Sequence, residues 1–324
     1  MAVLLINASM AWAQSGMQPE VIRSIRNDKS LPLRILAENM LPAQSGEPRI
    51  IPMMPSPFKG EVSGPFDLDP ALQDQMGTLL SSIPIANWEG ISDQDHSNII
   101  GTAYAPPDPT IDVGPDHVVQ MVNVLFAIYD KQGNLLLGPL RNNVLWAGFG
   151  GPCQNDTDGD PIVLYDHLAD RWILSQFAVS SGNSMCYAVS ETGDPTGSYF
   201  RYEFPFADFP DYPKLGVWHD AYYATFRLFD ANTLSFLGML AGAMERDSML
   251  VGAPAQMVLF SITNRLPGID GVAPADLDGP PLPLERPVSS WDFRIHRIEF
   301  LRLNSKSIGK IREALHLADR FSFL

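Results

Sequence analysis

The distribution of apolar and polar positions along this chain predicts short β-strands rather than long helices. Short runs rich in Val, Ile, Tyr, Phe and Trp alternate with clusters of Gly, Pro, Asn, Asp and Ser. The predicted strands cover 118–123, 125–129, 171–179, 185–189, 199–204 and 221–229. Turns are expected at 130–134, 180–183, 192–197 and 208–213, because Gly, Pro, Asn and Asp favour tight-turn conformations. Short strands separated by frequent turns indicate an all-β fold.

One sequence pattern recurs three times at a fixed distance. Pro109, Pro161 and Pro213 lie 52 residues apart, and an aspartate precedes each of them by one or two residues. These aspartates are Asp108, Asp160 and Asp211. Each proline is followed by an apolar segment and then by a second aspartate beside a strand candidate; these second aspartates are Asp116, Asp170 and Asp220.

A repeat of about 50 residues built from short strands is typical of a β-propeller blade. The sequence therefore predicts a β-propeller-like domain over 101–290, with blades of about 52 residues. Chance clustering of Asp and Pro in a chain with 28 prolines is the alternative explanation.

The segments on either side of this domain have a different composition. Residues 1–13 are apolar and end in Ala11-Trp12-Ala13, which predicts a signal peptide cleaved before Gln14. A buried strand or helix start is the alternative. Residues 14–100 are predicted to be a leader or linker with short helices at 19–27 and 68–80. Residues 291–324 form a divergent basic tail, in which 307–321 has the spacing of a weak amphipathic helix.

The charge and the cysteine content restrict the expected binding partners and cellular location of the protein. The net charge is −15, which argues against nucleic-acid binding because phosphates would be repelled. No stretch has the roughly 20 apolar residues of a transmembrane helix. Cys153 and Cys186 are predicted to form one disulfide in an oxidising compartment, with two buried free thiols as the alternative. A secreted, periplasmic or cell-surface location is expected.

Several longer motifs in 101–280 resemble a family of secreted bacterial proteins that is largely uncharacterised and β-propeller-like. They are GFGGPC (148–153), DGDPIVLYD (158–166), ADRW (169–172), SQF (175–177), DPTGSY (194–199) and DYPKLGVW (211–218). The resemblance implies export and a multi-bladed β fold, but it carries no catalytic residues. Members of that family continue for several more blades after the DLDGPP segment (276–281), so the propeller is expected to be incomplete, truncated or frameshifted.

Three alternating carboxylates form a candidate metal site. Asp156, Asp158 and Asp160 can present oxygen ligands on one side of a turn, which suits Ca²⁺. This is the one cofactor that the sequence suggests. The alternative is an acidic, solvated turn.

The repeated aspartates and a set of aromatic residues are the remaining candidates. Asp108, Asp160 and Asp211 are expected near the propeller axis, where carboxylates can act as the acid, base and nucleophile of a glycoside hydrolase. Stabilisation of the turns in which they lie is the simpler role. Candidates for contacting a glycan are Trp218, Tyr222 and Arg171, which packing between strands would explain equally well.

The function that the sequence favours is non-catalytic binding of a glycan, a cell-surface component or a protein partner by an exported propeller-like module. A glycoside hydrolase is the alternative in the enzyme class. A fragment without independent function is the third hypothesis.

Overall fold

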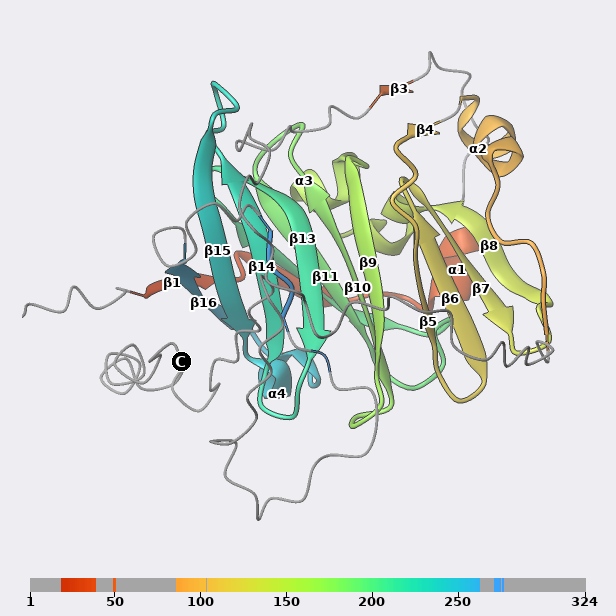
Figure 1. Cartoon of the computed structure of the whole chain (residues 1–324). Helices are drawn as coiled ribbons and strands as arrows, with labels where there is room; N and C mark the ends of the chain where they lie inside the picture. The colour runs from red at the N-terminus through yellow and green to blue at the C-terminus, as the bar shows by residue number, and fades with distance from the viewer. Residues whose placement is uncertain are drawn as a thin grey trace, which may run out of the picture.

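The computed structural model describes residues 19–38, 49–50, 86–102, 104–262, 271–274 and 276. These residues form antiparallel β-sheets with few and short helices, so the all-β prediction is confirmed (Figure 1). The predicted signal peptide at 1–13, the predicted helices at 68–80 and 307–321, and the basic tail lie outside the described residues.

Three four-stranded antiparallel meanders account for most of the fold, and we call them sheets I, II and III. Sheet I contains β5 (Thr110–Val113), β6 (His117–Val122), β7 (Leu125–Asp130) and β8 (Leu135–Arg141). Sheet II contains β9 (Gly159–Asp166), β10 (Arg171–Ala178), β11 (Ser184–Ser190) and β12 (Tyr199–Pro205). Sheet III contains β13 (Phe209–Val217), β14 (Tyr222–Phe229), β15 (Phe236–Met244) and β16 (Gln256–Ser261). The sheets lie side by side, and their first strands β5, β9 and β13 are neighbours (Figure 1).

The remaining elements are short. They are α1 (Leu33–Glu38), β3 (Arg49–Ile50), α2 (Asp93–Ile100), β4 (Tyr104–Ala105), the 3-10 helix η1 (Asn142–Trp146), α3 (Gly151–Asn155) and α4 (Arg246–Met249). Strands β3 and β4 form a parallel pair. None of the helices in the described ranges has the length and apolar character required to cross a membrane.

The N-terminal segment forms strands where a helix was expected. The helix predicted over 19–27 is wrong, because this stretch contains β1 (Glu20–Arg23) and the start of β2 (Arg26–Lys29). Strand β1 pairs with β16 and β2 pairs with β12, so they become the outermost strands of sheets III and II. Val21 and Ile22 pack into different apolar clusters, as successive residues of a strand do when both faces are covered.

The apolar core lies between the sheets. One cluster joins side chains of sheet I, including Val119 and Phe126, to Trp172 and Leu174 of sheet II. A second joins the other face of sheet II, including Ile173, to sheet III. Both faces of β10 are therefore buried, which explains why its sequence is a nearly continuous apolar run rather than an alternating one.

The strands predicted from apolar runs agree with β6, β7, β10, β11, β12 and β14 to within a few residues. The turn predicted at 208–213 is wrong, because Phe209–Val217 is strand β13. The Asp and Pro residues that suggested a turn instead coincide with a β-bulge between Asp211 and Lys214.

The predicted disulfide between Cys153 and Cys186 is confirmed. It joins α3, in the connection between sheets I and II, to β11 of sheet II. Both cysteines are fully buried beside the core cluster of these two sheets.

Buried ion pairs connect segments that are far apart in the chain. Arg246 in α4 donates two hydrogen bonds to Asp166 at the end of β9, at 2.7 and 3.0 Å, and Tyr222 of β14 donates a third at 2.8 Å. These hydrogen bonds connect β9 of sheet II to β14 of sheet III and to α4, which follows β15 of the same sheet. On the other side, Arg201 of β12 binds both carboxylate oxygens of Asp28 in β2 and also donates to backbone carbonyls of the η1 region.

Candidate functional site

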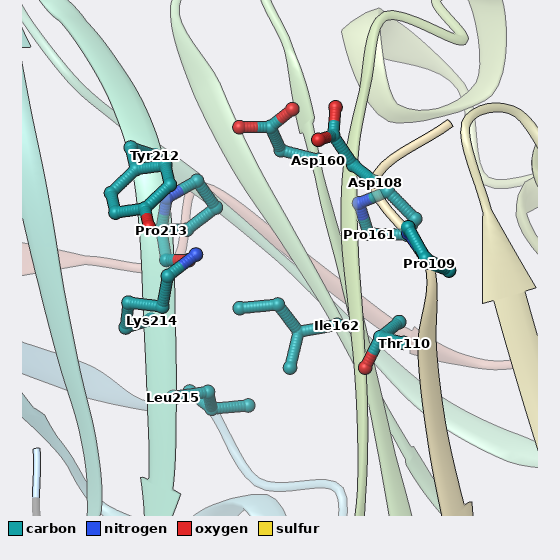
Figure 2. A pocket seen from close by; sticks show the side chains of 10 residues that line it. All are labelled: Asp108, Pro109, Thr110, Asp160, Pro161, Ile162, Tyr212, Pro213, Lys214 and Leu215. Atoms are coloured by element: carbon teal, nitrogen blue, oxygen red, sulfur yellow. The ribbon is translucent and has the colours of Figure 1, made fainter. Parts of the chain in front are cut away.

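The three Asp/Pro segments meet around one cavity of about 360 Å³ (Figure 2). Strands β5, β9 and β13 bring them together, because each segment lies at or near the start of the first strand of its sheet. The cavity is lined by Asp108, Pro109, Thr110, Asp160, Pro161, Ile162, Tyr212, Pro213, Lys214 and Leu215.

The backbone has the same unusual conformation in all three segments. Asp108, Asp160 and Tyr212, each directly before a proline, have φ angles of +36°, +42° and +49°. Non-glycine residues rarely adopt positive φ, and the cost is about 1–3 kcal/mol for each residue. In sheets II and III the strand ladder also shifts register at the Asp/Pro and Tyr/Pro pairs, because proline has no N–H to donate.

Tyr212, rather than Asp211, occupies the position that Asp108 and Asp160 occupy in the other two segments. The spacing of 52 residues already pointed to it, since it leads from 108 to 160 and then to 212. Asp211 does not line the cavity, and its carboxylate lies 3.7 Å from the Arg227 guanidinium. Burial raises the pKa of Asp211, and Arg227 opposes this shift.

Asp108 and Asp160 form a carboxyl pair that shares a hydrogen bond. Burial, and then the negative charge of Asp108, raise the pKa of Asp160 to about 7. The Asp160 carboxyl therefore holds a proton below about pH 7. In the described part of the chain, neither carboxyl forms an ion pair with a Lys, Arg or His side chain.

Lys214 is the cation that enters the cavity from β13. Its ammonium nitrogen lies 3.6 Å from the centroid of the Tyr212 ring and donates to the Pro213 carbonyl at 3.1 Å. Burial lowers the pKa of Lys214, while the surrounding carboxylates oppose this shift. The other two segments place Thr110 and Ile162 at the corresponding position, so only the third segment supplies a charge there.

Asn123, which follows β6, holds the carboxyl pair in place and was not predicted from the sequence. Its Nδ2 donates to Asp108 at 2.6 Å, and its Oδ1 accepts from the backbone N–H of Asp160 at 2.8 Å. The Asn123 carbonyl in turn lies 2.6 Å from Nε2 of His96, a buried residue of α2. An asparagine at the end of an apolar strand is a common turn residue, so the sequence held no specific signal for this role.

The three carboxylates of the predicted calcium site are not grouped around one point. Asp156 accepts hydrogen bonds from the backbone and hydroxyl of Ser181, and Asp158 accepts from the backbone N–H groups of Val179 and Ser180. Asp160 faces the cavity instead. Among the described residues, no set of three or more His, Cys, Asp or Glu side chains is placed to hold a metal ion.

The candidate glycan-contacting residues lie away from the cavity. Tyr222 is completely buried and bound to Asp166, so its ring has no face open to a ligand. Trp218 packs against a small apolar cluster of sheet III. Arg171 donates to the backbone carbonyls of Ala169 and Asp170.

Comparison with known proteins gives no relative for this chain: no family model, no curated protein and no solved structure matches it.

Proposed function

We propose that this chain is an exported, non-catalytic binding module, and that the cavity between β5, β9 and β13 binds a small carbohydrate. The observation that carries the proposal is the convergence of three sequence-distant Asp/Pro segments on one cavity with mixed polar and apolar walls. A concave site with a few convergent polar groups is the usual form of a small-ligand site.

The fold that we propose for this module is an open arrangement of β-propeller blades. Sheet I is a four-stranded antiparallel meander, and β2 and β1 extend the meanders of sheets II and III to five strands. The first strand of each meander contains or directly follows an Asp/Pro or Tyr/Pro pair at the cavity. This is the arrangement expected of consecutive blades around an axis. The resemblance to a secreted bacterial family, the apolar N-terminus and the Cys153–Cys186 disulfide support export.

The cavity walls have the chemistry that sugars require. The carboxyls of Asp108 and Asp160 accept hydrogen bonds from hydroxyl groups, and the Lys214 ammonium donates to ring or hydroxyl oxygens. Ile162 and Leu215 supply apolar surface for the C–H face of a sugar ring. Tyr212, with 47% of its surface exposed, places an aromatic ring at the rim.

The same geometry disfavours a glycoside hydrolase. A hydrolase needs two carboxyls about 5–10 Å apart, on either side of the bond to be cleaved. Asp108 and Asp160 instead contact each other through a hydrogen bond, and Asp211 is paired with Arg227. The raised pKa of Asp160 suits an acid catalyst, but the carboxyl beside it, Asp108, shares a hydrogen bond with it and leaves no room between them for the bond to be cleaved.

Binding of the purified chain to an array of immobilised glycans tests the proposal. We expect retention on a defined subset of glycans, and loss of at least about tenfold in affinity in Lys214→Met, because the ammonium is a hydrogen-bond donor in the cavity. Asp116→Asn is the matched control, since this exposed aspartate lies in the turn at the opposite end of β5. If no glycan is retained, or if Lys214→Met binds like the control, the proposed function is wrong.

A further inference from the structure

The proposed function leaves open which sugars the cavity selects. We propose that it selects a sugar with a free amino group, whose ammonium group binds between the carboxyl groups of Asp108 and Asp160. This inference rests on the proposed function and makes it more specific.

Within the described ranges, no protein cation forms an ion pair with Asp108 or Asp160. Asp108 receives a hydrogen bond from Asn123, which is a neutral donor, and the Asp160 carboxyl receives none there from a protein group other than Asp108. Figure 2 shows the two carboxyl groups side by side at the β5 and β9 side of the cavity. Two adjacent carboxyls that line a cavity without such an ion pair are a site for a cation from outside.

Lys214 does not provide this cation. Its ammonium is held over the Tyr212 ring and by the Pro213 carbonyl, on the β13 side of the cavity (Figure 2). It forms no ion pair with Asp108 or Asp160 in the part of the chain that is described. A ligand can therefore contact the carboxyl pair with its amine and Lys214 with a hydroxyl oxygen.

The charge of the cavity also favours an amine. The pKa of about 7 means that the Asp160 carboxyl holds a proton below neutral pH. When a ligand ammonium enters, that proton leaves to solvent, so the charge of the cavity is the same before and after binding. A ligand carboxylate would instead add a negative charge beside Asp108 and Asp160.

A divalent metal fits the pair less well than an amine does. Calcium takes six to eight oxygen ligands and magnesium demands octahedral geometry. In the described residues, only Asp108, Asp160 and the Thr110 hydroxyl offer side-chain oxygens on this side of the cavity. A single ammonium with three N–H donors can be satisfied by two carboxylates and one further acceptor.

Calorimetric titration of the full chain with matched sugars tests the inference. The probes are glucosamine and galactosamine, each compared with the parent hexose and with the N-acetylated sugar, which lacks the charge. The titrations are carried out at pH 6, in two buffers with different ionisation enthalpies. We expect at least one free amino sugar to bind about tenfold or more tightly than both of its neutral counterparts, and to release close to one proton per ligand.

Asp160→Asn and Asp108→Asn each replace a carboxyl by an amide of nearly the same shape that carries no charge, so they test whether the charge is needed for amine binding. We expect each variant to lose both the preference for the amine over the parent hexose and the proton release that accompanies binding of the amine. Asp116→Asn is expected to behave like the wild-type chain. Far-ultraviolet circular dichroism and a thermal melt establish that each variant is folded, and the two positions provide independent tests.

The possible failures can be told apart. If neutral and amino sugars bind equally and no proton is released, the amine inference is wrong and carbohydrate binding stands. If ethanolamine binds as tightly as the amino sugars, with proton release, and no neutral sugar binds, the amine site stands and the carbohydrate function is wrong. If calcium competes at micromolar concentration, the carboxyl pair is a metal site and the inference is overturned. If none of the probes binds, both proposals fail.

Discussion

At the scale of single residues, equivalent positions in the three segments of the cavity share one backbone conformation but carry different side chains. Asp108, Asp160 and Tyr212 share a positive φ before a proline, yet two of them are acidic and one is aromatic. Thr110, Ile162 and Lys214 show the same divergence two residues later. A common backbone with different side chains produces one asymmetric site, with carboxyls on one side and an ammonium on the other.

The raised pKa of Asp160 predicts a pH dependence of stability. Its ordinary value is 3.8 and its folded value is about 7, so the folded state binds the proton more tightly than the unfolded state does. The resulting stabilisation is complete below about pH 4 and is lost as the pH rises through about 7. Asp160→Asn removes this titration.

As the pH rises from 4 to 8, the wild-type chain loses this stabilisation and Asp160→Asn does not. We therefore expect the free energy of unfolding of the variant to rise relative to that of the wild-type chain by about 1–3 kcal/mol over this range. Urea denaturation followed by fluorescence, repeated across this pH range, measures the difference. A constant difference between the two proteins over the whole range would contradict the raised pKa of Asp160. Asp116→Asn, at an exposed position, should show no such trend.

Replacement of Asn123 is expected to lower the free energy of unfolding because it removes buried hydrogen bonds. Asn123→Ala leaves the buried donors and acceptors around Asp108, Pro106 and Asp160 without their partner, which we expect to cost about 2–4 kcal/mol in the free energy of unfolding. Chemical denaturation measures this cost. Asn98→Ala, at an exposed position of α2, is the matched control with an expected change within about 0.5 kcal/mol. Equal effects of the two substitutions would show that the buried amide does not organise the carboxyl pair.

The sequence located part of this site and missed the rest for physical reasons. Asp108 and Asp160 were predicted because Asp before Pro is a strong local signal at a constant spacing. Tyr212 was missed because the prediction followed the aspartates and chose Asp211, although the 52-residue spacing leads to 212. Lys214 was missed because a lysine in a strand is an ordinary surface residue unless its neighbours in space are known. Asn123 acts through contacts with residues that are 15 and 37 positions away, and no local pattern reports such contacts.

At the scale of elements, strands were predictable where their own sequence determines them. Strands β10 and β11 are apolar on both faces, so their side chains alone indicate burial. Strand β2 has the sequence RNDK and becomes a strand because β12 offers it an unpaired edge. Strand β13 contains Asp and Pro residues that resemble a turn, and its pairing with β14 on either side of a bulge overrides that local preference.

The Cys153–Cys186 disulfide links α3 to sheet II and is expected to stabilise the fold. It closes a loop between residues separated by 33 positions, for which the chain-entropy model gives about 3–4 kcal/mol. We expect the double variant Cys153→Ser, Cys186→Ser to lose about 2–4 kcal/mol in the free energy of unfolding. The wild-type chain in excess reductant serves as the internal comparison. If neither the variant nor reduction lowers the denaturation midpoint, the bond does not stabilise the fold.

At the scale of the whole molecule, the sheets are joined by few but deeply buried polar contacts. The Asp166 carboxylate has no exposed surface and binds the Arg246 guanidinium, which is 8% exposed. Backbone N–H groups of the following turn also donate to it. A buried carboxylate without its cation is costly, so this contact adds to the apolar cluster that joins sheets II and III.

Arg246→Met leaves Asp166 charged and buried, and we expect it to lower the free energy of unfolding by about 3–5 kcal/mol. Tyr222→Phe removes one hydrogen bond to the same carboxylate and keeps the ring, with an expected loss of about 1 kcal/mol. Urea denaturation of both variants, and of their combination, measures the coupling. Losses of similar size in the two single variants would argue against a dominant role for the ion pair.

The pairing of β1 with β16 and of β2 with β12 also has a consequence for synthesis. Residues 20–29 are translated well before their partner strands at 199–205 and 256–261. Until those strands exist, β1 and β2 have no edge to join. Sheets II and III are therefore completed by pairing between segments that are made far apart in time.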